Sequence, residues 1–163
     1  MKLFSDLCEN KKAWQLLAIS ALGLELVALY FQYVMDLAPC IMCIYQRVAI
    51  WAIFLAGVIG AFAANNIIGR FAGYALLGTG AIWGLLIAIE HVEMQTNTDP
   101  FNFFSCDIIP NFPDWMPLHQ WFPAIFEPRG SCGDIDWQFL SFSMPQWMVL
   151  IFAAYSLAFI TVF

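Results

Sequence analysis

The residues best able to carry chemistry in this sequence are its five cysteines, Cys8, Cys40, Cys43, Cys106 and Cys132. Cys40 and Cys43 form a Cys-x-x-Cys motif directly after Pro39. A disulfide across two residues closes too small a ring to stabilise much chain, so this spacing is typical of redox pairs. Pro39 favours a helix that begins at or just after Cys40, where unpaired N–H groups of the first turn stabilise a thiolate. The motif therefore predicts thiol–disulfide exchange.

The remaining cysteines leave alternatives open. A Cys106–Cys132 bond could take part in redox exchange or simply brace the loop that contains it. A tetrathiolate zinc site is disfavoured, because Cys106 and Cys132 are 26 positions apart and lack the spacing of a metal-binding pair. Haem attachment requires a histidine after the motif, where Ile44 stands. We therefore predict no metal site.

Three ionisable residues near these cysteines need explanation. Arg47 follows Cys43 by four residues, so a helix places it on the same face and one turn deeper in the apolar zone. A cation there is costly, which predicts a partner such as the Cys43 thiolate or a ligand beside it, although an arginine snorkelling to lipid phosphates is the alternative. Glu25 should face the bundle in a structural role, and sequence alone leaves the role of His91 open.

The elements that position these residues are predicted to be membrane helices. The chain has 163 residues, of which 62% are hydrophobic and only 11% charged. Runs of about 20 apolar residues, the length that crosses a bilayer, occur at about 13–33, 44–64, 71–89 and 144–163. Six Lys and Arg without a cluster argue against nucleic acid as a partner. We expect one transmembrane domain over 1–163, with loops at 34–43 and 90–143 on one side.

Basic residues predict the orientation. The side of the membrane that carries both termini also carries four basic residues, Lys2, Lys11, Lys12 and Arg70. Basic residues favour the cytoplasmic side, so Cys40, Cys43, Cys106 and Cys132 are predicted to lie on the outer side. Cys8 then lies inside as a spectator thiol. The first span is long for a signal peptide, so we interpret it as an uncleaved helix.

The long 90–143 loop is acidic, aromatic and rich in proline, which precludes a long helix within it. The stretch Asp114–Phe122 predicts about two helical turns lying in the membrane interface. Glycines at 57, 60, 69, 73, 80 and 84 have the spacing of helix-packing residues and are assigned no chemistry. The fold expected is an all-α four-helix transmembrane bundle with one long outer loop that carries a short interfacial helix.

Longer motifs extend these observations along the whole chain. They are Leu24-Glu25-Leu26 and Phe31-Gln32, Pro39-Cys40-Ile41-Met42-Cys43-Ile44-Tyr45-Gln46-Arg47, Glu90-His91, Phe112-Pro113, Trp115 and Met144-Pro145-Gln146-Trp147. Together with Cys106 and Cys132 in a long outer loop, they closely resemble the DsbB family of bacterial disulfide-bond formation proteins. The family usually carries a polar tail after the fourth span, whereas this chain stops at Phe163, and the stretch from His91 to Cys106 is somewhat longer here.

The resemblance implies an enzyme of the bacterial inner membrane that reoxidises a DsbA-like periplasmic oxidase and reduces a membrane quinone, either ubiquinone or menaquinone. It implies that a Cys106–Cys132 disulfide accepts electrons first, with Cys106 forming the mixed disulfide with the partner. Cys132 would then exchange with Cys40, releasing the Cys43 thiolate beside a quinone held by Arg47 and His91. The alternatives are a paralogue that serves a dedicated partner and a non-enzymatic membrane scaffold braced by disulfides.

Overall fold

The computed structural model describes residues 11–63, 66–96 and 110–162, and four long helices dominate it. They are α2 (Lys11–Tyr33), α3 (Ile41–Phe62), α4 (Ile67–Thr96) and α7 (Met144–Val162). Each is long and apolar enough to cross a bilayer. The chain is therefore an all-α multi-pass membrane protein, as its composition and apolar runs predict.

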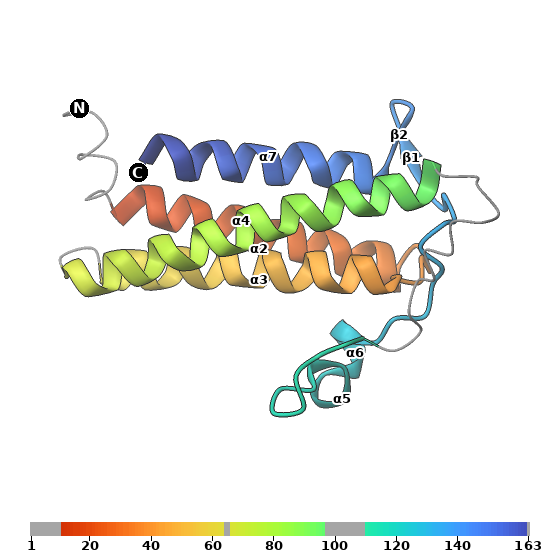
Figure 1. Ribbon diagram of the computed structural model, residues 1–163, viewed down its shortest axis with the longest axis horizontal. Coiled ribbons are helices and arrows are strands. Elements are labelled where there is room, and N and C mark those ends of the chain that lie inside the picture. The colour runs from red at the N-terminus through yellow and green to blue at the C-terminus, as the bar shows by residue number, and fades with distance from the viewer. Residues whose placement is uncertain (1–10, 64–65, 97–109, 163) are drawn as a thin grey trace.

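The four helices run alternately up and down (Figure 1). Helix α3 packs against α2 on one side and α4 on the other, and α4 packs against α7. Helices α2 and α7 pack together only weakly, although the hydroxyls of Ser20 and Tyr155 link them at 3.0 Å. The start of α2 and the end of α7 lie at one end of the bundle. The starts of α3 and α7 lie at the other end (Figure 1).

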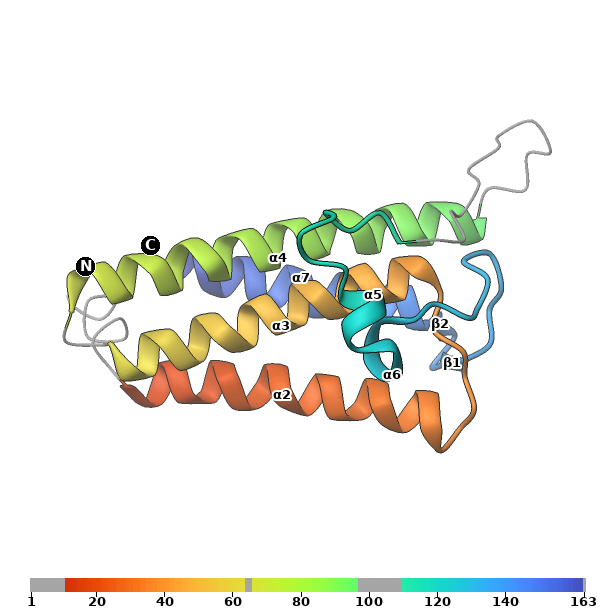
Figure 2. The same ribbon diagram turned by 90° about the horizontal axis from the view of Figure 1, so that it is seen from below.

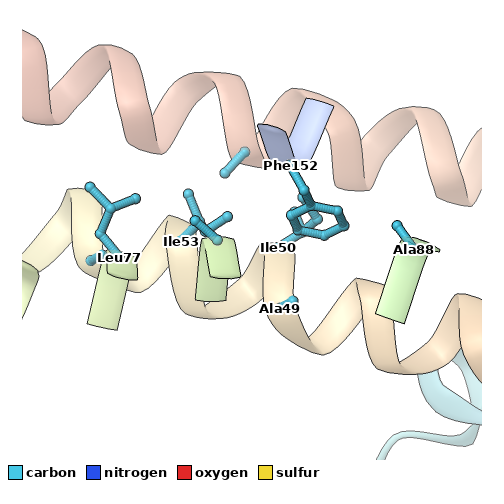
Figure 3. Close-up of a cluster of buried hydrophobic side chains, with 9 residues drawn as sticks. Ala49, Ile50, Ile53, Leu77, Ala88 and Phe152 are labelled. Carbon is cyan, nitrogen blue, oxygen red and sulfur yellow. The ribbon is translucent and has the colours of Figure 1, made fainter. Parts of the chain in front are cut away.

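A cluster of small and branched side chains fills the centre of the bundle. Ile50 and Ile53 of α3, Leu77 and Ala88 of α4, and Phe152 of α7 are all buried there (Figure 3). The predicted packing glycines make this closeness possible. A Cβ on Gly84 would lie 2.2 Å from the Phe152 ring, which is closer than non-bonded atoms approach.

The third long helix extends beyond the predicted apolar run at both ends. The run was placed at about 71–89, whereas α4 begins at Ile67 and continues to Thr96. Asn66 Oδ1 accepts the backbone N–H of Ile68 and so satisfies a donor in the first turn. Polar residues after Ile89 end the apolar run, but no proline interrupts the helix there, so it continues past His91.

The long loop contains two short helices instead of the one predicted at Asp114–Phe122. These are α5 (Leu118–Trp121) and α6 (Pro123–Phe126), and Pro117 is the N-cap of the first. Pro123 disfavours the α conformation at Phe122, whose φ and ψ are −132° and 64°, so the two turns do not join. Helix α6 lies beside α3 and α2 (Figure 2). A small antiparallel pair, β1 (Gln138–Phe139) and β2 (Phe142–Ser143), precedes α7.

Gly57→Ala tests the close contact of α3 with α2. A Cβ at Gly57 would lie 2.6 Å from the backbone nitrogen of Ala18, and backbone cannot rotate away as a side chain can. We expect a loss of about 1–3 kcal/mol in the free energy of unfolding, measured by titration with a denaturing detergent. Gly23→Ala on α2 is the control, because nothing lies within 4 Å of its added Cβ. Equal stability of the two variants would contradict the packing described.

Candidate functional site

Cys40 and Cys43 lie at the start of α3, where the Cys-x-x-Cys motif predicted a helix N-terminus. Cys40 is the N-cap, and its sulfur accepts the backbone N–H of Cys43 at 3.3 Å. The two Sγ atoms are 2.8 Å apart and both thiols are free. The hydrogen bond to Cys43, reinforced by burial, raises the pKa of the Cys40 thiol well above its usual value. In the reduced pair, Cys40 therefore keeps its proton.

His91 of α4 is buried beside this pair. Its Nε2 lies 3.6 Å from Cys40 Sγ, and its Nδ1 lies 3.3 Å from Nε2 of Gln46. Both His91 and Gln46 are buried. The contact with Gln46 fixes the ring plane and directs the opposite nitrogen at the cysteine. Helix α4 reaches this position because it continues beyond its apolar run.

Arg47 is buried one turn below Cys43 and is surrounded by polar partners. Its Nε lies 3.3 Å from Oε1 of Glu25 on α2, a close ion pair that lacks hydrogen-bond geometry. Its NH1 donates to Oε1 of Gln32 at 2.8 Å and also to the backbone carbonyl of Ile125 in α6. The Gln32 amide in turn donates to the carbonyl of Ala124 at 3.0 Å. One guanidinium thus joins α2, α3 and α6.

Cys132 is held beside Cys40 by backbone contacts. The N–H groups of Arg129 and Gly130 both donate to the carbonyl of Pro39, at 2.9 and 3.0 Å. A side chain at 130 would not fit, because its Cβ would lie 2.3 Å from the Ala38 carbonyl oxygen. Cys132 is 1% exposed and belongs to the same buried cluster as Cys40. Cys132 is disulfide-bonded, and neither Cys40 nor Cys43 is its partner, since both are free.

A cavity of about 320 Å³ opens beside these residues, between α2 and α7. Its walls are mainly apolar and include Leu24, Val27 and Phe31 of α2 and Trp147, Met148 and Ile151 of α7. Cys40, Cys43, Gln46, Arg47 and His91 line it as well. The arrangement is an apolar pocket with a few convergent polar groups beside a dithiol, which is typical of a ligand site.

Comparison with known proteins agrees with this geometry. The family model described as "Disulfide bond formation protein DsbB" matches residues 10–162. The chain belongs to the DsbB family. It is 50% identical over 160 residues to Disulfide bond formation protein B of Psychromonas ingrahamii, an alignment that covers 98% of this chain and 85% of the relative. The protein of that name from Mannheimia succiniciproducens is 51% identical over 158 residues, covering 96% of this chain and 87% of the relative.

Membership of the DsbB family makes the chain a membrane disulfide bond formation protein and assigns it a disulfide-forming oxidoreductase role. Of the residues predicted to act in that role, Cys40, Cys43, Arg47 and His91 line one cavity, and Cys132 packs beside Cys40. Cys106, and Cys8 with its predicted spectator role, lie outside the described residues. The family resemblance predicted that His91 belongs to this site, whereas the position of His91 in the sequence alone left its role open.

The sequence analysis missed part of the polar network in this DsbB-family site. Arg47 was expected to pair with the Cys43 thiolate or with a ligand beside it, and it does interact electrostatically with Cys43. Its hydrogen bonds and ion pair go to Glu25, Gln32 and Ile125, which the sequence analysis did not name as partners. Glu25 was interpreted as structural, yet it lines the cavity. Gln46 was not singled out. Its signal was a buried amide inside an apolar helix, a position that requires a hydrogen-bonding partner.

The Pro39 contact predicts how fast Cys40 and Cys132 can join. In a chain with Cys8, Cys43 and Cys106 replaced, mild oxidation should form a Cys40–Cys132 disulfide. The rate at which this disulfide forms is measured by mass spectrometry of non-reduced peptides. Gly130→Ala should slow this reaction severalfold, since its Cβ would collide with the Ala38 carbonyl. Gly133→Ala is the matched control, with nothing within 4 Å of the added Cβ. Equal rates for the two variants would show that the contact does not position Cys132.

Proposed function

We propose that this protein reoxidises a DsbA-like soluble dithiol oxidase and transfers the electrons to a membrane quinone. The observation that carries the proposal is the free Cys40–Cys43 pair, which lies between a buried disulfide-bonded cysteine and an apolar cavity. Exchange of disulfides needs neighbouring sulfurs, and removal of electrons needs an acceptor on the other side. This site has both.

In the proposed relay, the partner's thiolate attacks Cys106 of a Cys106–Cys132 disulfide and releases the Cys132 thiolate. Cys132 then attacks Cys40 of the oxidised Cys40–Cys43 pair, which forms a Cys40–Cys132 bond and releases Cys43 as a thiolate. The partner's second thiol resolves its mixed disulfide and frees Cys106. Cys106 attacks Cys132, which restores the loop disulfide and leaves Cys40 and Cys43 reduced. The partner has then lost two electrons and two protons, which reside in the Cys40–Cys43 dithiol.

The cavity suits a quinone on chemical grounds. A quinone supplies an acceptor for two electrons and two protons, and its ring and chain are apolar apart from the two carbonyls. The apolar walls from α2 and α7 match the ring and chain. Arg47 and His91 would hold carbonyl oxygens, because both are buried and line the cavity beside Cys43 with side-chain nitrogens that can donate. Weak packing between α2 and α7 leaves a route into the cavity from the bilayer.

The proposed orientation puts the cysteines in the periplasm and both termini in the cytoplasm of a bacterial inner membrane. Lys11 and Lys12 at the start of α2, and Arg70 near the start of α4, lie at the bundle end away from Cys40 (Figure 1). Positively charged residues favour the cytoplasmic side. An oxidising compartment at the opposite end is where a relay of disulfides can operate.

Cys43→Ser tests the proposed electron exit. Without the Cys43 thiol, the Cys40–Cys43 disulfide that Cys132 attacks cannot form, so oxidation of a reduced DsbA-like protein by added quinone should fall to the rate without enzyme. Thiol consumption and quinol formation are measured together in detergent micelles. Cys8→Ser is the control and should keep full turnover. Turnover of Cys43→Ser equal to that control would rule out this assignment.

Arg47 should contribute to both stability and quinone binding, and a double variant separates the two. Arg47→Met leaves Glu25 buried without its cation, and we expect a loss of about 3–5 kcal/mol in the free energy of unfolding. Glu25→Leu combined with Arg47→Met removes both charges and should recover much of that stability.

The double variant should nevertheless keep a quinone KM raised roughly tenfold or more, because the hydrogen bond from a charged donor contributes about 1.5–3 kcal/mol. The KM for the dithiol partner should stay near its original value. If the double variant regained normal quinone KM together with its stability, the role of Arg47 would be purely structural.

A further inference from the structure

Cys40, Cys43 and His91 form a ligand set for a thiophilic metal ion. The two sulfurs and one ring nitrogen of His91 all lie within 4.8 Å of one another. Cys40 and His91 are buried and Cys43 is half-buried. Two thiolates and a neutral imidazole are ligands that Zn²⁺ and related ions prefer, and a Cys-x-x-Cys pair commonly supplies two of them.

The distances fit tetrahedral coordination after a small movement. Bonds of about 2.3 Å to sulfur and 2.0–2.1 Å to nitrogen place the ligand atoms of a tetrahedral zinc site roughly 3.6–3.8 Å apart. Cys40 Sγ and His91 Nε2 already lie 3.6 Å apart. The two sulfurs, at 2.8 Å, need to separate by about 1 Å. Rotation of the Cys43 side chain toward the cavity that it lines supplies this movement.

The surroundings are those of a metal-binding histidine. Such a histidine has its second ring nitrogen held by another group, which orients the first toward the ion. Gln46 Nε2 lies against Nδ1 of His91, and a half-turn of the Gln46 amide presents Oε1 as the acceptor of an Nδ1–H, which leaves the lone pair of Nε2 directed at Cys40. The charge of a divalent ion is balanced by two thiolates, so no net charge is buried. Arg47, which lines the same cavity, is itself paired with Glu25.

We propose that the reduced form of this protein captures one thiophilic divalent ion, Zn²⁺ in the first instance, through Cys40 Sγ, Cys43 Sγ and His91 Nε2. The fourth coordination position faces the cavity. Binding releases the two thiol protons to solvent and involves no change of oxidation state. A Cys40–Cys43 disulfide has no thiolates to offer, so metal capture is confined to the reduced pair. The site differs from a tetrathiolate centre because His91 replaces Cys106 and Cys132.

One consequence rests on the function proposed above. Thiolates held by a metal ion cannot attack a disulfide or pass on electrons, so Zn²⁺ should inhibit turnover reversibly, and a chelator should restore it. The ion acts there as an inhibitor that competes with reoxidation.

The test is a titration of the full chain in detergent micelles with Cd²⁺, whose bonds to thiolates absorb in the ultraviolet. The protein carries Cys8→Ala, Cys106→Ser and Cys132→Ser, so that Cys40 and Cys43 are its remaining thiols. The reduced protein should bind one Cd²⁺ per chain, and the same protein oxidised at Cys40–Cys43 should bind none. His91→Gln should weaken binding tenfold or more, whereas His119→Gln, which changes the other histidine of the chain, should leave it unchanged.

A second measurement covers the case in which these variants fold poorly. X-ray absorption of Zn²⁺ bound to the fully reduced wild-type chain should show two sulfur ligands and at least one imidazole nitrogen. Coordination by four sulfurs, absence of saturable binding, or binding unaffected by His91→Gln would overturn the proposal. Neither measurement contains a dithiol partner or a quinone, so its outcome is independent of whether the proposed relay is correct.

Discussion

A guanidinium buried within a membrane span must be neutralised and hydrogen-bonded, and in this protein that requirement organises the site. Arg47 meets it with a carboxylate and an amide from α2 and a backbone carbonyl from α6. The same contacts join α2 to α3 and hold α6 beside both helices (Figure 2). Without Arg47, the hydrogen bond that joins α3 to α6 would be lost, and the cavity beside Cys43 would lose its cation.

A second constraint works through the backbone alone. The Pro39 carbonyl precedes the helix that presents Cys40, and it accepts two N–H groups from the segment that leads to Cys132. One peptide group therefore sets the position of two cysteines that lie far apart in the sequence. A Cβ at position 130 would collide with the backbone carbonyl of Ala38, so the contact depends on a glycine at this position. Together with Arg47, it places a disulfide-bonded cysteine, a dithiol and an apolar cavity in that order.

Sequence predicted the parts of this arrangement that follow from local rules. Apolar runs indicated four spans, and Pro39 before the Cys-x-x-Cys motif indicated a helix beginning at Cys40, because both depend only on neighbouring residues. The partners of Arg47 could not be predicted in this way, since Glu25 and Ile125 come from elements whose positions relative to α3 are set by tertiary packing. The short helix predicted at Asp114–Phe122 forms only as α5, which begins after its N-cap Pro117, and the second turn, α6, begins at Pro123 beyond the predicted stretch.

The order of sulfur exchange is the central claim, and time-resolved disulfide mapping tests it most directly. The oxidised chain is mixed with reduced DsbA-like protein and quinone, quenched with acid at successive times, alkylated and examined by mass spectrometry, while quinol is measured in parallel. A Cys40–Cys132 peptide should appear before quinol and decline as the Cys106–Cys132 peptide returns. Quinol that forms while Cys40–Cys132 never appears would contradict the relay.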